Sequence, residues 1–88
     1  MNLQIQINEI IELYQKGQLQ QAKQVASKLI KTSSNNAFLH NLLGAINLNL
    51  NDLNTAKLNY KKATEINPHY SEAFCNLGSV LIDLNFLE

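Results

Sequence analysis

The sequence predicts an all-α fold in which five helices form a row of antiparallel hairpins. Three observations predict this fold. Only three glycines and one proline interrupt the 88 residues, and the apolar residues between them recur at three- and four-residue steps, as on one face of a helix. No segment alternates apolar and polar residues in the manner of a half-buried strand. Short links of about two to five residues make neighbouring helices antiparallel.

The first two helices are expected at about residues 3–16 and 18–31, with a turn at Gly17. The polar segment 32–36 is rich in capping residues and ends the second helix. The two apolar stripes consist of Leu3, Ile7, Ile10, Ile11 and Tyr14, and of Leu19, Ala22, Val25, Ala26 and Leu29.

Two further helices are expected at about residues 37–50 and 53–66. Asp52 is a candidate N-cap for the second of them. Pro68 ends that helix, since proline lacks an amide donor and disfavours helix at the residue before it. A fifth helix begins at Tyr70 or Ser71, and its apolar face consists of Phe74, Leu77, Leu81 and Leu84.

Charge and composition exclude several classes of protein. Seven lysines balance seven acidic residues and arginine is absent, so no basic face predicts nucleic-acid binding. No run of eighteen apolar residues occurs, and membrane insertion is therefore not expected. The single cysteine, Cys75, excludes an intrachain disulfide and favours a reducing compartment, which predicts a cytoplasmic protein.

Small and turn-forming residues recur with a period of 34. Ala22 recurs as Ala56, and Gly44 as Gly78. Small side chains at Gly44 and Ala56 let two antiparallel helices approach closely, and Tyr60 fills the wider space one turn further on. The same period relates Gly17, Asn51 and Asn85, three residues whose types tolerate left-handed backbone.

This pattern resembles the tetratricopeptide repeat family. His40 and Asn47 depart from the family pattern in the middle copy, and Ile10 and Ser34 depart from it in the first. The resemblance implies a right-handed α-solenoid over residues 1–88, with repeats at about 3–36 and 37–70 and an incomplete one at 71–88. The residues expected to pack the repeats are Ala22, Leu43, Gly44, Ala56, Tyr60, Ala63, Pro68, Leu77 and Gly78.

The family resemblance implies a non-enzymatic scaffold that binds a peptide or protein surface in a concave groove, with no cofactor. The first helix of each hairpin would line this groove. The sequence is also similar to the repeat arrays of O-linked N-acetylglucosamine transferases, where an asparagine recurs two residues before the glycine; Asn8 and Asn76 match that position and Leu42 interrupts it. The expected groove residues are Asn8, Ile11, Gln15, Asn41, Ala45, Leu48, Asn49, Cys75, Asn76, Ser79 and Asp83.

Other residues carry no recognisable catalytic or metal-binding pattern. His40 and His69 have no spacing to Cys75 or to acids that indicates a metal site, and we expect them to be packing and loop residues. Cys75 is expected to be a small free side chain rather than a nucleophile. Two alternatives to a scaffold remain. One is the N-terminal recognition part of a larger enzyme of glycosyltransferase or sulfotransferase type. The other is RNA binding, which the charge disfavours.

The fifth expected helix is unusually apolar. It contains Val80, Leu81, Ile82, Leu84, Phe86 and Leu87. Repeat proteins normally end in a unit with a polar outer face, and no such unit follows here. The sequence therefore predicts either a fragment of a longer array or a helix whose exposed face pairs with a second copy or another partner.

Overall fold

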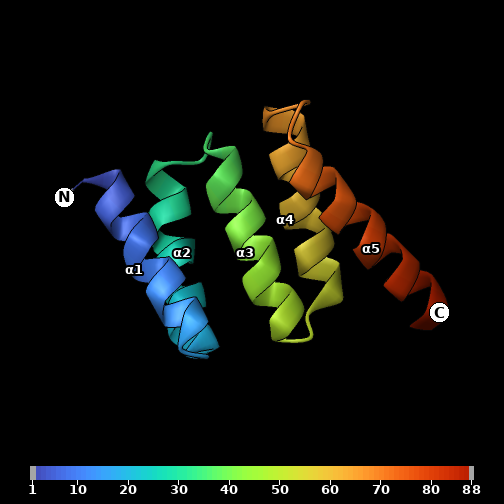
Figure 1. Ribbon diagram of the computed structural model, residues 1–88, viewed down its shortest axis with the longest axis horizontal. Helices are drawn as coiled ribbons and strands as arrows, with labels where there is room; N and C mark the ends of the chain where they lie inside the picture. The colour runs from blue at the N-terminus through green and yellow to red at the C-terminus, as the bar shows by residue number, and fades with distance from the viewer. Residues whose placement is uncertain (1, 88) are drawn as a thin grey trace.

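A computed structural model describes residues 2–87 as five α-helices joined by short turns (Figure 1). Met1, Glu88 and the side chain of Leu87 lie outside the described residues. Residue 88, the last of the predicted third repeat, is therefore not described. The helices are α1 (Leu3–Gln15), α2 (Leu19–Thr32), α3 (Ala37–Asn49), α4 (Leu53–Ile66) and α5 (Ser71–Leu87). These bounds confirm the predicted helices to within one or two residues.

Each helix packs on the next one in the chain, and consecutive helices run antiparallel (Figure 1). The described chain measures 41 × 28 × 18 Å along its principal axes. Because the helices form an elongated row, each hairpin buries its apolar face against its neighbours in sequence. The predicted row of hairpins is confirmed.

Two turns each contain a residue with left-handed backbone at the same position in the repeat. Gly17 has φ 78° and Asn51 has φ 66°, as their residue types predict. Glycine has no Cβ penalty in this region, and asparagine is among the few other residues that enter it. The third residue of the series, Asn85, lies inside α5, so it makes no turn in the structure.

The backbone closes both turns with the same hydrogen bonds. The Gln18 amide donates to the Leu13 carbonyl at 2.9 Å, and 34 residues later the Asp52 amide donates to the Asn47 carbonyl at 2.8 Å. This six-to-one bond defines a Schellman motif, which satisfies carbonyls that the helix leaves without partners. Each hairpin turn is therefore stabilised by its own main chain.

Short polar side chains begin three of the helices. Each accepts a hydrogen bond from a backbone amide of the first turn, which satisfies one of the donors left without a helical partner. Asp52 does so for α4, as predicted, and α4 ends at Ile66 before Pro68. The cap bonds join Asn2 Oδ1 to the Gln4 amide (2.7 Å), Asn36 Oδ1 to the Leu39 amide (2.9 Å) and Asp52 Oδ1 to the Thr55 amide (3.2 Å).

The core consists of two clusters along the row. The first lies between α1, α2 and α3, and the second joins α4 to α5. The second is small: Ala56, Tyr60 and Val80 are fully buried in it, and Leu77 and Leu84 pack against them. The larger cluster contains Ile7, Ile10, Ala22, Ala26, Leu29, Leu39, Leu42, Leu43 and Ile46.

Candidate functional site: the face formed by α1, α3 and α5

The first helices of the hairpins, α1, α3 and α5, lie next to one another along one side of the molecule. Two side-chain hydrogen bonds join them: Asn49 Nδ2 donates to the Tyr14 hydroxyl at 2.9 Å, and Asn76 Nδ2 donates to Asn41 Oδ1 at 3.1 Å. Each bond connects residues 35 positions apart in the sequence. We call this surface the α1–α3–α5 face.

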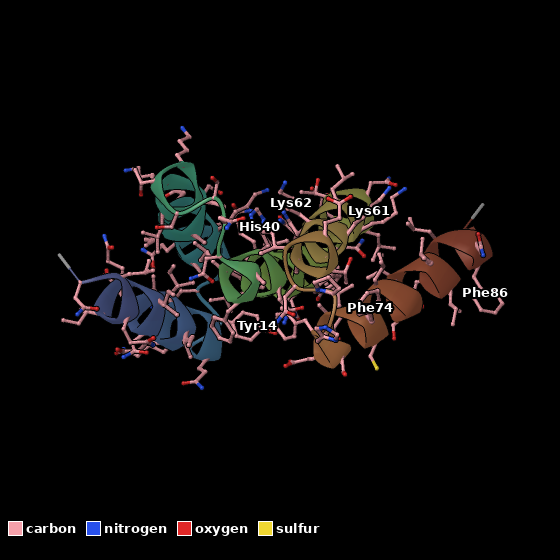
Figure 2. All side chains as sticks on the ribbon, turned by 90° about the horizontal axis from the view of Figure 1, so that it is seen from above. Tyr14, His40, Lys61, Lys62, Phe74 and Phe86 are labelled. Atoms are coloured by element: carbon pink, nitrogen blue, oxygen red, sulfur yellow. The ribbon has the colours of Figure 1, made fainter. Side chains whose placement is uncertain are left out.

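Figure 2 shows the two sides of the row. Tyr14 and Phe74 lie on the side of α1 and α5, whereas Lys61 and Lys62 lie on the opposite side, on α4. Both lysines are exposed, as expected for the polar face of that helix. The α1–α3–α5 face is thus free of the lysine pair.

The predicted groove residues differ in their exposure. Only Asn41 is fully buried, with 6% of its surface exposed. Polar side chains dominate the accessible set, and its amides and hydroxyl can both donate and accept hydrogen bonds. The exposed members are Asn8, Gln15, Asn49, Cys75, Ser79 and Asp83, and the partly buried members are Ile11, Ala45, Leu48 and Asn76.

The two asparagines of the expected ladder use their amides within the protein. Asn8 Oδ1 accepts from Gln4 Nε2 at 2.9 Å along α1, and Asn76 donates to Asn41. Leu42, which interrupts the series, is buried in the core. The structure therefore joins Asn76 on α5 to Asn41 on α3, whereas the hydrogen bond of Asn8 stays within α1.

Tyr70 precedes α5 beside the Asn41–Asn76 pair. Burial raises the pKa of its hydroxyl, and the nearby Glu72 carboxylate raises this pKa further, whereas a hydrogen bond with Asn41 lowers it. The phenol therefore stays protonated at neutral pH. Neutral hydroxyl and amide groups consequently meet at the junction of α3 and α5.

Asn49 has the most suitable geometry for contact with a ligand. Its Nδ2 donates both to the Tyr14 hydroxyl and to the Ala45 carbonyl, at 2.9 and 2.8 Å. These bonds hold the exposed amide in one orientation, and its Oδ1 accepts no hydrogen bond within residues 2–87. An oriented carbonyl oxygen can accept a hydrogen bond from the backbone N–H of an extended peptide.

The predicted packing residues differ in how deeply they are buried. Ala22, Leu43, Gly44, Ala56, Tyr60 and Ala63 are buried. Pro68 is exposed in the turn before α5, and Leu77 is partly buried. Gly78 has open space around it, because a Cβ built there meets nothing within 4 Å. Its small size therefore serves no contact within residues 2–87.

A hydrogen-bonded asparagine pair with one buried member was not recognised from the sequence. Asn47 is 1% exposed, and its Nδ2 donates to Asn59 Oδ1 on α4 at 2.8 Å. Asn47 Oδ1 has no hydrogen-bond partner. The signal was the departure of Asn47 from the aromatic residue that the repeat pattern expects, since a polar side chain at a packing position needs a partner.

The histidines have the structural roles predicted for them. His40 is buried, and its Nε2 lies 2.8 Å from the Ser34 carbonyl oxygen. His69 is exposed in the turn before α5. Among residues 2–87, no three His, Cys, Asp or Glu side chains come together as a metal site requires.

The row of hairpins and its side-by-side first helices define a helical-repeat protein. Residues 39–70 match the tetratricopeptide repeat family, which identifies this segment as a tetratricopeptide repeat. The five-helix row is consistent with a short array of such repeats. Repeats of this family are generally protein–protein interaction modules and are typically non-catalytic.

The family match concerns the repeat alone. No curated protein matches the chain, and the predicted likeness to O-linked N-acetylglucosamine transferase arrays has no support in the family match, which is to the repeat alone. Within residues 2–87, every helix is too short or too polar to cross a membrane.

Proposed function

We propose that the chain is a scaffold that binds an extended peptide or a protein segment across the α1–α3–α5 face. The observation that carries the proposal is the Asn49–Tyr14 hydrogen bond, because it joins two first helices and orients an exposed amide on the surface between them. A side chain that is already ordered loses less conformational entropy when it binds.

The proposal includes two further copies of the repeat, one formed by α1 and α2 and one begun by α5. Three features support these copies. Ala22 and Ala56, 34 residues apart, are both fully buried. The turns after α1 and α3 each have a residue with left-handed backbone at the same position and the same six-to-one hydrogen bond. Gly78 follows Gly44 at the same spacing.

The chemistry of the face suits a polypeptide backbone. Its exposed polar side chains are mostly amides and a hydroxyl, and Asp83 is the one acidic residue among the candidate residues. Amides pair with both the N–H and the C=O groups of an extended chain. Ile11, Ala45 and Leu48 are partly buried between them and offer apolar contact to alternate side chains of the ligand.

A titration with peptide libraries, followed by amide NMR on the 88-residue chain, tests this function. The expected shifts fall on α1, α3 and α5, and Asn49→Ala weakens binding about five- to tenfold, as the loss of one hydrogen bond predicts. Asn54→Ala is the matched control, since Asn54 is exposed on α4 and should leave affinity unchanged. Shifts confined to α2 and α4 would refute the assignment of the face.

A further inference from the structure

The lysines and the acidic residues of this chain are segregated between the two sets of helices. The first helices of the hairpins carry acids and no lysine: Glu9 and Glu12 lie on α1, and Glu72 and Asp83 lie on α5. The second helices have Glu65 as their one acid, and together they carry Lys23, Lys28, Lys31, Lys57, Lys61 and Lys62. The net charge of zero therefore conceals acidic first helices and basic second helices.

Both acids of α5 lie on the side of that helix next to α3. Four polar residues follow one another along α5 at steps of four, three and four positions, which places them on one face of the helix. They are Glu72, Asn76, Ser79 and Asp83. Because Asn76 donates to Asn41 Oδ1 on α3 at 3.1 Å, this side of α5 belongs to the α1–α3–α5 face. Glu72 and Asp83 are exposed there.

Within residues 2–87, neither carboxylate of α5 forms an ion pair. The one ion pair of this part of the chain joins Lys16 Nζ to Glu12 Oε1 at 2.9 Å. Lys61 and Lys62 lie on the opposite side of the row (Figure 2), and physiological salt screens exposed charges beyond about 8 Å. The carboxylates of α5 are therefore available to a positive charge from another molecule.

Two aromatic residues lie near Glu72, where α3 and α5 meet. Phe38 is 45% exposed and precedes Asn41 by one turn of α3, as Glu72 precedes Asn76 by one turn of α5. Since α3 and α5 run in the same direction (Figure 1) and the Asn41–Asn76 bond joins them, Phe38 and Glu72 lie at the same level. The Glu72 carboxylate raises the pKa of Tyr70, and Asn41 forms a hydrogen bond with Tyr70. The phenol is therefore close to both.

We propose that the segment bound by the α1–α3–α5 face carries an arginine, whose guanidinium pairs with Glu72 and stacks on Phe38. This inference rests on the proposed function and adds the charge of the ligand to it. A guanidinium is always ionised, pairs with a carboxylate through two parallel hydrogen bonds and stacks on aromatic faces. Its remaining N–H groups can donate to the Tyr70 hydroxyl oxygen.

Three peptide libraries test the charge preference. They share the same randomised uncharged residues and differ only at a fixed central residue, which is arginine, glutamine or glutamate. Titrations followed by amide NMR on the 88-residue chain give the affinities. The arginine library should bind about tenfold more tightly than the glutamine library, because an exposed ion pair and a cation–π contact each contribute up to about fivefold. The glutamate library should bind most weakly.

Single substitutions locate the site. Glu72→Gln should reduce the preference for arginine over glutamine about fivefold, and Phe38→Leu should reduce it about two- to threefold. Both side chains are exposed, so the fold is retained. Glu65→Gln removes an exposed acid from α4, and Asp83→Asn removes the acid about 16 Å further along α5. These two controls should leave the preference within about twofold of the original.

The possible outcomes separate this inference from the proposed function. Equal affinities for the arginine and glutamine libraries, with shifts on α1, α3 and α5, would overturn the arginine site and leave peptide binding in place. A preference for arginine that survives Glu72→Gln, or that Glu65→Gln reduces equally, would overturn the site as well. If none of the three libraries shifts the α1–α3–α5 face, both proposals fail.

Discussion

The aromatic ring of Tyr60 on α4 lies directly against the backbone of Gly44 on α3. A Cβ at Gly44 would stand 2.5 Å from the ring carbon Cε1 and 2.6 Å from Cδ1. Real Cβ atoms do not approach other heavy atoms this closely, so the contact requires glycine. Tyr60 is 1% exposed, and the α3–α4 packing therefore depends on this fit between a missing side chain and a large one.

Substitution of Gly44 by alanine should destabilise the fold. Both Gly44→Ala and Gly78→Ala gain about 1 kcal/mol of helix propensity, but only the first pushes a methyl group into Tyr60. Overpacking of this kind costs about 1–3 kcal/mol, which is the expected difference between the two variants in urea unfolding. Equal free energies of unfolding for both variants would contradict the contact.

The hydrogen bond between buried Asn47 and partly buried Asn59 predicts an asymmetry between single and double substitutions. Asn59→Ala leaves the buried Asn47 amide without its acceptor and should cost about 1–3 kcal/mol. Replacing both residues by leucine removes both polar groups and should leave the protein at least as stable as the original. Urea unfolding of the two variants measures the difference, and a neutral effect of Asn59→Ala would show that the hydrogen bond contributes little.

Stability should fall at alkaline pH through Tyr60. Burial, together with the charges of Tyr14 and Glu72, raises the pKa of Tyr60 from 10.0 to about 12. The unfolded chain therefore loses this proton first, so the contribution is complete below pH 10 and is lost as pH rises from 10 toward 12. The expected loss is about 2 kcal/mol.

Tyr60→Phe isolates this contribution. The variant has no phenol to ionise at this position, so its stability should fall less steeply over the same pH range. Tyr70 acts in the same direction, since its pKa is also raised, and it remains in both proteins. Parallel pH profiles for the two proteins, obtained by urea unfolding, would show that Tyr60 does not carry the effect.

The N-cap of α3 offers a test of local stability. Asn36 Oδ1 accepts from the Leu39 amide at 2.9 Å, and its loss in Asn36→Ala should cost about 1 kcal/mol. The neighbouring Asn35 is exposed and provides the control variant Asn35→Ala, which should be within about 0.5 kcal/mol of the original protein. Thermal unfolding distinguishes the two. A similar loss of stability in both variants would show that the N-cap hydrogen bond is not the cause.

The helices were predictable because their signals are local. Asp52 and Pro68 mark the two ends of α4, and Gly17 and Asn51 mark turns, since each acts through its own backbone or the next few residues. Asn85 shows the limit of such reasoning. Its type permits a turn, but nothing at that position interrupts the helical pattern, and α5 continues through it.

The contacts between helices were less predictable. The close fit of Gly44 with a neighbouring helix was expected, but its contact with the ring of Tyr60 depends on how far α4 slides along α3. The bond between Asn41 and Asn76 joins residues 35 positions apart, and periodicity indicates only that both lie on similar helix faces. Many asparagines share those faces, so the sequence could not select the pair that meets.

The self-contained turns have a consequence for how this chain could have arisen. A turn that is closed by its own main chain keeps its shape without help from the neighbouring hairpin, so a duplicated segment already carries a working turn and only its packing faces need to adapt. The turn position accepts glycine in one hairpin and asparagine in the other, whereas the helix faces that pack on neighbours are more constrained. The two turns of this molecule accordingly share their backbone geometry although the residue at the turn differs.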